Sequence, residues 1–385
     1  MAVLIIFCLV QLAFATPITK RAAFDPAGAY QSALNATWST FWNAQYQSFN
    51  SYDPSCNPAF NYAVVWDAAV AAKAVVDSKD VDKTNLVISS LYKYQNPQGW
   101  FTSSPGGNEI YTDDNAQVLW VFLEAWSLTN NQTLLTTATN LMHLIQSQWS
   151  SVGGVTWKVG SSYIASISTA EAAFSAAKLY QYVNDASLLT FATSCLAWLD
   201  QHLTDPSDGF YYDGLSKDTW QVNKGKLTYT VGAAISAYTY LYKATGNASY
   251  LNIAMSKATA TLTKPTFLNS NGAWNNPLCY VHLLFAGFAD LITIGHVEGY
   301  NPSLFTQANF VYLFDQLGRS GHYASSYTSV KSSFANYVSI AGSSSGVSYA
   351  YDAGNYCSGN ENQPLRTALT DGSAAQIFYS ISKLT

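Results

Sequence analysis

Two consecutive acids, Asp113 and Asp114, are the residues of this chain best placed to do chemistry. They follow Thr112 at the start of an apolar segment, in a chain of 385 residues that is only 11% charged. Two neighbouring carboxyl groups can divide the work of covalent catalysis, one attacking as a nucleophile and the other moving a proton. Enzymes that cleave glycosidic bonds with retention hold two carboxyl groups about 5–5.5 Å apart, a separation that adjacent residues can reach. The pair therefore indicates a carbohydrate-cleaving site.

A simpler interpretation of the same residues is the start of a helix. Thr112 can cap a helix, and acids in the first turn interact favourably with the positive end of the helix dipole. That dipole lowers the pKa of a carboxyl group, which opposes a role as general acid. Catalysis would need burial among aromatic side chains, together with repulsion between the two carboxylates, to raise one pKa. The sequence leaves both interpretations open.

Aromatic residues make up 15% of the chain and gather in glycine-rich loops and at helix starts. Sugar rings present apolar C–H faces that pack against aromatic planes. The candidate substrate-binding residues are Trp66, Asp67, Trp100, Tyr111, Trp157, Tyr229 and Trp274. Core packing is the alternative for the aromatic members, and Asp67 could equally be a buried structural hydrogen-bonding group. Asp213, which precedes Gly214, is most simply a turn residue.

Helical periodicity defines the elements that must position these residues. Apolar residues at helical spacing predict twelve helices. They cover residues 27–49, 60–78, 80–95, 113–128, 133–148, 168–183, 186–202, 229–245, 248–263, 278–294, 301–318 and 372–383. Residues 325–338 are a candidate for a further helix.

A repeat connects these segments into hairpins. An aromatic residue near the end of one helix is followed by a turn at Asn131, Asp185 or Asn247, and then by the next helix. The spacing of these turns matches one helical hairpin plus its long loop. Six such hairpins predict an all-α fold, an (α/α)6 barrel of about twelve helices, in which one set of loops surrounds a central cleft.

The N-terminus has the features of a processed secretory protein. An apolar run over residues 3–10 precedes a small-residue cleavage site at 13–15, which predicts a signal peptide over 1–15. The dibasic pair Lys20-Arg21 predicts a short pro-segment over 16–21, leaving a single catalytic domain over 22–385. We therefore expect a secreted, extracellular protein.

Composition narrows the classes of partner. A net charge of −5 disfavours nucleic-acid binding, which needs basic patches. The C-terminus carries no hydrophobic tail of the kind that directs a lipid anchor, so we expect no membrane anchor. The five histidines lack metal-ligand spacing and no cofactor motif occurs, so we expect neither a metal nor a cofactor. The expected partner is a polysaccharide or oligosaccharide, bound by a monomer.

Cysteines and sequons fit an extracellular protein. The four cysteines outside the signal segment permit two disulfides in three connectivities, or free buried thiols. They are Cys56, Cys195, Cys279 and Cys357. Three sequons, which indicate a glycoprotein, begin at Asn35, Asn131 and Asn247.

Several motifs occur in an order that carries further information. Asp113-Asp114 at a helix start is followed by Gly-Gly-Val-Thr-Trp at 153–157, by Gly-Phe-Tyr-Tyr-Asp-Gly at 209–214 and by the segment 228–254. Over roughly residues 60–295 this order resembles glycoside hydrolase family 76, the α-1,6-mannanase family. The resemblance implies an (α/α)6 barrel and retaining, endo-acting cleavage of α-1,6-mannan. It also implies that Asp113 is the nucleophile and Asp114 the general acid/base.

One segment departs from that family's pattern. The family commonly has Tyr-Asn-Gln-Gly where this chain has Tyr229-Thr230-Val231-Gly232. Two amide side chains that could bond substrate hydroxyls are therefore missing. This departure motivates one alternative to a hydrolase, a catalytically inactive carbohydrate-binding protein of the same fold. A cell-wall transglycosylase is a further alternative, and the missing lipid-anchor signal counts against it.

Overall fold

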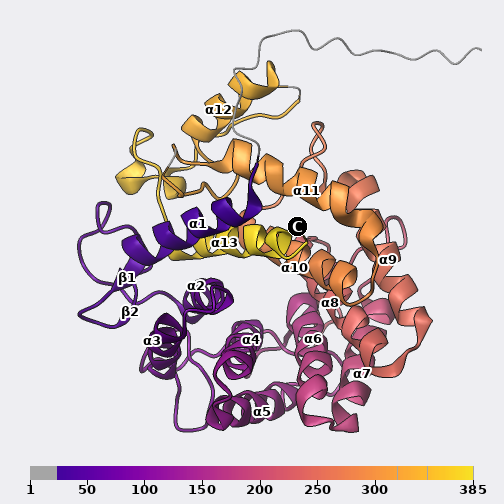
Figure 1. Cartoon of the computed structure of the whole chain (residues 1–385). Coiled ribbons are helices and arrows are strands. Elements are labelled where there is room, and N and C mark those ends of the chain that lie inside the picture. The colour runs from indigo at the N-terminus through magenta and orange to yellow at the C-terminus, as the bar shows by residue number, and fades with distance from the viewer. Residues whose placement is uncertain (1–23, 319, 345, 385) are drawn as a thin grey trace, which may run out of the picture.

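The structure is a computed structural model that describes residues 24–318, 320–344 and 346–384. The expected signal peptide and pro-segment lie outside these residues, so both stay predictions. The described residues form thirteen α-helices and five short strands (Figure 1). Among the described helices, none is long and apolar enough to cross a membrane.

Six helices form a closed inner ring. Each packs against the next in chain order, and the last packs against the first (Figure 1). They are α2 (Val65–Asp77), α4 (Thr112–Thr129), α6 (Ser166–Val183), α8 (Thr228–Thr245), α10 (Leu278–Thr293) and α13 (Ala368–Ser382).

Six further helices surround this ring. α3, α5, α7 and α9 each pack on the inner helix that precedes them, while α1 and α11 cover α13. The outer helices are α1 (Pro26–Phe41), α3 (Val81–Tyr92), α5 (Gln132–Gln146), α7 (Ala186–His202), α9 (Ala248–Thr263) and α11 (Asn301–Phe310). The (α/α)6 barrel predicted from the hairpin repeat is confirmed.

All twelve expected helices occur, with differences at their ends. The first ends at Phe41, because the segment beyond it pairs as the short strands β1 (Trp42–Asn43) and β2 (Ser48–Phe49). α11 continues as a π-helical turn over Val311–Asp315. The further candidate helix is α12 (Lys331–Ala341), which lies outside the ring in Figure 1.

The repeated turns owe their form to two adjacent residues. In the α4–α5 turn Asn130 adopts the left-handed conformation, and Asn131 then caps α5 by accepting from the Thr133 amide. Asp185 and Asn247 cap α7 and α9 in the same way. Because a side-chain cap satisfies an otherwise unbonded amide, this pair ends one helix and starts the next within two residues. The repeat read from the sequence is therefore a capping motif.

Small residues let the inner helices approach one another. α8 and α10 meet at Gly232 and Gly287, where a Cβ atom on Gly232 would lie 2.3 Å from the Leu283 carbonyl oxygen. Such close backbone packing requires glycine at the contact. The glycine contact therefore lets the backbones of α8 and α10 pack closely together.

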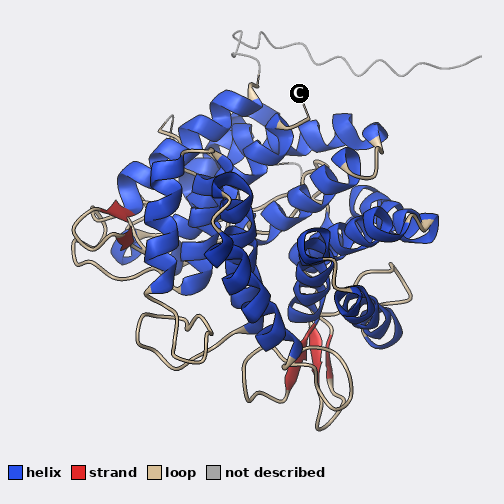
Figure 2. Cartoon of the chain, turned by 60° about the horizontal axis from the view of Figure 1, so that its bottom comes forward, coloured by secondary structure: helices blue, strands red, loops and turns tan. Residues whose placement is uncertain are grey.

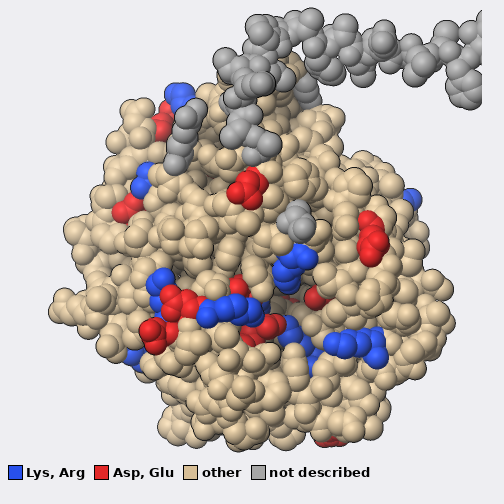
Figure 3. Space-filling model, viewed as in Figure 1, with Lys and Arg blue, Asp and Glu red and all other residues tan. Residues whose placement is uncertain are grey.

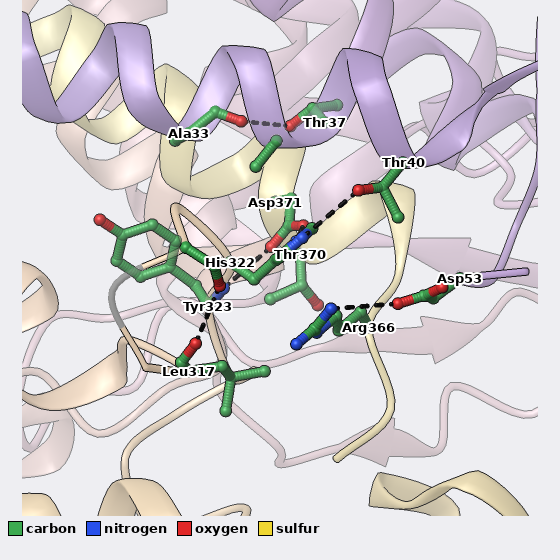
Figure 4. A network of polar contacts seen from close by, with 12 residues as sticks. Ala33, Thr37, Thr40, Asp53, Leu317, His322, Tyr323, Arg366, Thr370 and Asp371 are labelled. Carbon is green, nitrogen blue, oxygen red and sulfur yellow. Dashed lines mark hydrogen bonds and ion pairs between the residues drawn. The ribbon is translucent and has the colours of Figure 1, made fainter. Parts of the chain in front are cut away.

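A buried polar network fixes the start of α13, the helix that closes the ring (Figure 4). The Asp371 carboxylate is fully buried, pairs with His322 and accepts from the Tyr323 amide at 2.9 Å. The other ring nitrogen of His322 lies 3.3 Å from the Thr40 hydroxyl on α1. The network therefore joins α1, α13 and the loop before α12.

A disulfide joins Cys56 to Cys357, across 301 residues of sequence. The other two cysteines, Cys195 and Cys279, are free thiols, so one of the two disulfides that the sequence permits is present. Near the disulfide, Arg366 pairs with Asp53 at 3.2 Å. These contacts attach the C-terminal loops to the segment before α2.

The loops at one end of the barrel carry a small sheet (Figure 2). Its strands β3 (Tyr163–Ala165), β4 (Gly214–Ser216) and β5 (Val222–Asn223) pair antiparallel in that order. β3 leads directly into α6. The sheet therefore lies at the N-terminal ends of the inner helices.

Candidate active site

The first turns of the inner helices meet at this end of the barrel. Trp66 and Asp67 occupy the first turn of α2, Asp113 and Asp114 that of α4, and Tyr229 that of α8. All five side chains are partly exposed. Because the ring brings parallel helix starts together, residues far apart in sequence lie at one end of the barrel.

These helices begin without side-chain caps, unlike the outer ones. In α2, α4, α6, α8 and α10 the side chain of the N-cap residue makes no capping bond, and in α8 the Thr228 amide donates instead to Asn276 Oδ1 at 2.9 Å. Loop carbonyls bond the first amides in most of them: Thr112 N donates to Trp157 O, and Ser166 N donates to Asp213 O, both at 2.8 Å. Helix starts with free amides carry a partial positive charge that favours negative groups. The helix starts around the acids therefore carry partial positive charge from their backbone amides.

The expectation that Thr112 caps the helix is wrong. Tyr111 occupies the N-cap position, and Thr112 is the first helical residue, buried with its hydroxyl unbonded by any described residue. Asp113 and Asp114 lie in the first turn of α4 rather than at its N-cap, and backbone amides of this turn lower the pKa of Asp113. The acids therefore interact with the helix start, and this does not prevent a catalytic role.

Asp113 has one bonded and one unbonded oxygen. Its Oδ2 accepts from Trp157 Nε1 at 3.2 Å, while Oδ1 is buried without a donor among the described residues. Burial raises the pKa of Asp113 from its ordinary value of 3.8 to about 7, against the lowering effect of the helix amides and of Trp157. A buried carboxylate oxygen without a donor is uncommon and marks Asp113 as a candidate functional group.

Asp114 holds its proton more tightly than its neighbour. Burial, the Asp113 carboxylate and then the Asp67 carboxylate raise the pKa of Asp114 well above its usual range. Burial also raises the pKa of Asp67 to about 7. Carboxyl groups that crowd together cannot all ionise. Near neutral pH this group of acids can therefore hold both an ionised and a protonated carboxyl group.

Aromatic side chains line the cleft on both sides of the acids. The exposed Trp157 ring lies 5.0 Å from the Tyr111 ring, measured between centroids. Across from them Tyr280 stacks near Trp66 at 6.2 Å and meets Tyr229 edge-on at 4.9 Å. Planar rings beside acids are the surfaces on which sugar rings pack.

Five of the seven predicted substrate-binding residues are at least partly exposed at this end, and the other two are buried. Trp100 is only 6% exposed and belongs to the hydrophobic core. Trp274 is equally buried; its indole donates to the Thr261 carbonyl at 3.0 Å and its ring packs against Phe285. For these two the core interpretation is correct, because their loops fold inward over apolar helices.

Sequence reasoning missed several residues of the site. Glu171 on α6 is fully buried and accepts from Gln117 at 3.1 Å; burial and then Asp113 raise its pKa well above the usual range. Asp213, read as a turn residue, accepts from the Tyr163 hydroxyl and from Asn223 Nδ2 at 2.9 Å. A lone acid in an alanine-rich helix was the available signal for Glu171.

Metal binding finds no support in the arrangement of side chains. Within the described ranges, no three His, Cys, Asp or Glu residues are grouped so as to hold a metal ion. The acids of the cleft instead bond to indole, hydroxyl and amide donors. Proton transfer and nucleophilic attack by carboxylates are the chemistry that this arrangement can perform.

Comparison with known proteins places this geometry in a family. Residues 28–296 match the sequence profile of glycosyl hydrolase family 76. The chain belongs to this family. Among curated proteins, the Meiotically up-regulated gene 191 protein of Schizosaccharomyces pombe is 29% identical over 204 residues. That alignment covers 46% of each chain, so the chain spans about half the length of this relative.

Solved structures of family 76 share the fold. A GH76 α-mannanase of Bacteroides thetaiotaomicron matches with a TM-score of 0.77 at 17% identity, covering 93% of this chain and 96% of its own. An inactive variant of the α-1,6-mannanase GH76A of Salegentibacter sp., solved with α-1,6-mannotriose, matches at 0.73 and 18%, over 94% and 100%. In that variant two consecutive aspartates are replaced by asparagine. Dfg5 of Chaetomium thermophilum, solved with glucosamine, matches at 0.68 and 13%, over 93% and 90%.

Thr230 and Val231, which replace the two amide residues of the family 76 pattern, are buried. Thr230 is 2% exposed, with its hydroxyl 3.4 Å from that of Ser166 on α6, and Val231 is 1% exposed in the core. Tyr229, one residue earlier, stays at the rim beside Tyr280. The two positions where the family has amide side chains therefore lie in the packed layer beneath Tyr229.

Proposed function

We propose that this family 76 protein is a retaining, endo-acting glycoside hydrolase that cleaves α-1,6-mannan or a related α-mannoside. The observation that carries the proposal is the Asp113-Asp114 pair in the first turn of α4. The pair is partly buried and lies beside aromatic rings at the end of the barrel. The substrate class is inferred from the family and from the mannanases that share the fold.

Each acid has a role that fits its surroundings. Asp113, ionised and hydrogen-bonded by Trp157, attacks the anomeric carbon. Asp114, protonated, gives its proton to the leaving oxygen, and the bond between sugar and leaving group breaks. Asp114 then takes a proton from water as the water displaces Asp113 and releases the product. Trp157, Tyr111 and Trp66 provide faces for the sugar rings.

We further propose that the protein acts outside the cell. The apolar N-terminal run, the disulfide between Cys56 and Cys357 and the exposed sequon asparagines support this location. Disulfides form and persist in oxidising compartments.

The test is hydrolysis of α-1,6-mannan by the wild type, Asp113→Ala and Asp114→Ala. We expect oligosaccharide products from the wild type only, with retained anomeric configuration by NMR. Equal activity in all three proteins would exclude the pair as catalytic. Longer oligosaccharides made from added acceptors would indicate a transglycosylase, and glycan binding with no turnover would indicate an inactive binding protein.

A further inference from the structure

A second cavity lies at the opposite end of the barrel, among the C-terminal halves of the inner helices. Its volume is about 120 Å³. Figure 3 views this face, where acidic and basic side chains lie side by side around a hollow in the middle. The charged residues that line it are Lys73, Asp77, Glu124, Lys178, Asp290 and Lys383. The catalytic proposal uses none of them.

The cavity arises from polar stripes along the inner helices. On α4, Gln117, Trp120 and Glu124 follow Asp113 at helical spacing and therefore share its face, toward the barrel axis. On α6, Phe174 and Lys178 extend the stripe in the same way. Polar side chains at this spacing line a cavity at the end of the barrel axis.

Most of the charges in the cavity are paired. Lys73 bonds Asp77, and Lys178 bonds Glu124, each at 2.6 Å. Asp290 accepts from the Ser236 hydroxyl at 2.7 Å. Lys383 differs from the other two lysines, because within the described chain no carboxylate lies at ion-pair distance from its ammonium group. The lining therefore holds three lysines and three carboxylates, and an external anion at the mouth would pair with Lys383 in the field of Asp77 and Asp290.

The lysines also keep Glu124, inside the cavity, in its ionised form. Burial alone would raise the pKa of Glu124, yet Lys178, Lys73 and Lys383 together hold it well below its usual range. Three ammonium groups thus act on one carboxylate. Lys383 is exposed, so it lies where the cavity meets solvent. An arriving anion can reach it without displacing either ion pair.

The remaining lining suits a sugar. The Tyr379 ring lies 4.8 Å from the Lys383 ammonium group and 5.8 Å from that of Lys73, measured to its centroid. Gln376 and Asp290 offer amide and carboxyl groups to hydroxyls beside that ring. Aromatic planes next to hydrogen-bonding groups are a common way to hold a polyol.

A purely stabilising role for these ion pairs explains fewer features of the cavity than a ligand-binding role does. Buried ion pairs contribute little net stability, because desolvation offsets their attraction. A structural network would also pair its cations and fill its space, whereas this one leaves Lys383 unpaired beside an open cavity.

We propose that this cavity is a second binding site, for a hexose-sized sugar that carries one anionic group, a phosphate or a carboxylate. The anion would pair with Lys383, the ring would pack on Tyr379, and hydroxyls would bond Asp290 and Gln376. The site is separate from the acid pair, so it does not depend on the proposed hydrolase activity.

The test is isothermal titration of the full-length protein with mannose 6-phosphate, glucuronate, mannose and inorganic phosphate. We expect at least one anionic sugar to bind about tenfold or more tightly than mannose or phosphate alone, as one charge-assisted hydrogen bond provides. The stronger of the two anionic sugars identifies the anion. Failure of both to bind overturns the proposal.

Variants then locate the binding. Lys383→Gln should weaken it by about tenfold or more, while Lys264→Gln, the same change at an exposed lysine at the end of α9, should not alter it. Asp290→Asn should weaken the sugar but leave the preference for an anion. Asp113→Asn should leave binding intact. Unchanged affinity in Lys383→Gln, or loss of binding in Asp113→Asn, overturns the proposal.

Discussion

Replacing Asp113 by asparagine should abolish hydrolysis and at the same time stabilise the fold at neutral pH. Asparagine keeps the size of the side chain and an oxygen that can accept from Trp157 Nε1. It removes the carboxylate that burial makes costly to ionise. Loss of activity and gain of stability should therefore occur in one variant, as expected when a site is strained for function.

The magnitude follows from the two pKa values of Asp113. The carboxyl group titrates near 3.8 when exposed and at about 7 in the fold. Below pH 3.8 the group is protonated in both states, and the wild type carries no penalty. As the pH rises from 3.8 to about 7, the unfolded chain releases its proton first, so the folded state loses stability. The full difference is about 4 kcal/mol, an upper bound because water reaches part of the group.

The assay is equilibrium urea unfolding of the wild type and Asp113→Asn at pH 4 and at pH 7. The free energy of unfolding should differ little at pH 4, and the variant should be more stable by up to about 4 kcal/mol at pH 7. Asp218→Asn, the same change at an exposed aspartate, controls for the general loss of a negative charge. A gain that is the same at both pH values, or a loss at pH 7, would refute the reasoning.

Three further predictions address the site and the fold. Trp157→Phe removes the indole bond that lowers the pKa of Asp113, so the acid limb of the pH–rate profile should move up by about one pH unit; an unmoved limb would contradict this. Cys357→Ser opens a disulfide that closes 301 residues, and urea unfolding should show a loss of about 4 kcal/mol, reproduced in the wild type by a reductant. Gly232→Ala should cost about 3 kcal/mol, because its Cβ meets backbone of α10, whereas Gly299→Ala has open space and should cost little. Similar losses in the two glycine variants would argue against the close approach.

Much of the fold could be predicted because its signals are local. Asn131, Asp185 and Asn247 cap the helices that follow them, and a cap depends only on neighbouring backbone amides. Apolar spacing likewise located the helices to within a few residues at most ends. The first helix was extended too far because the chain beyond Phe41 remains aromatic and apolar while it turns into a strand pair.

The site was only partly predictable because burial is a property of the assembled ring. Trp157 and Trp274 occupy similar glycine-rich loops, yet the first is 41% exposed beside Asp113 and the second is 6% exposed in the core. Glu171 reaches the acid pair from another helix. No local pattern states which loop folds inward or which helix faces meet.

The sequence by itself determined the helical hairpins, the acid pair and the motif order of the family, because each rests on residues close together in the chain. Only the tertiary structure shows the surroundings that the proposed catalytic role of Asp113 and Asp114 needs. The ring of parallel helix starts leaves their amides to loop carbonyls, surrounds the acids with aromatic rings and brings Asp67 within range of Asp114. Burial and repulsion between the carboxylates then raise both pKa values. Both effects arise only when segments distant in the sequence are packed together in a low-dielectric environment.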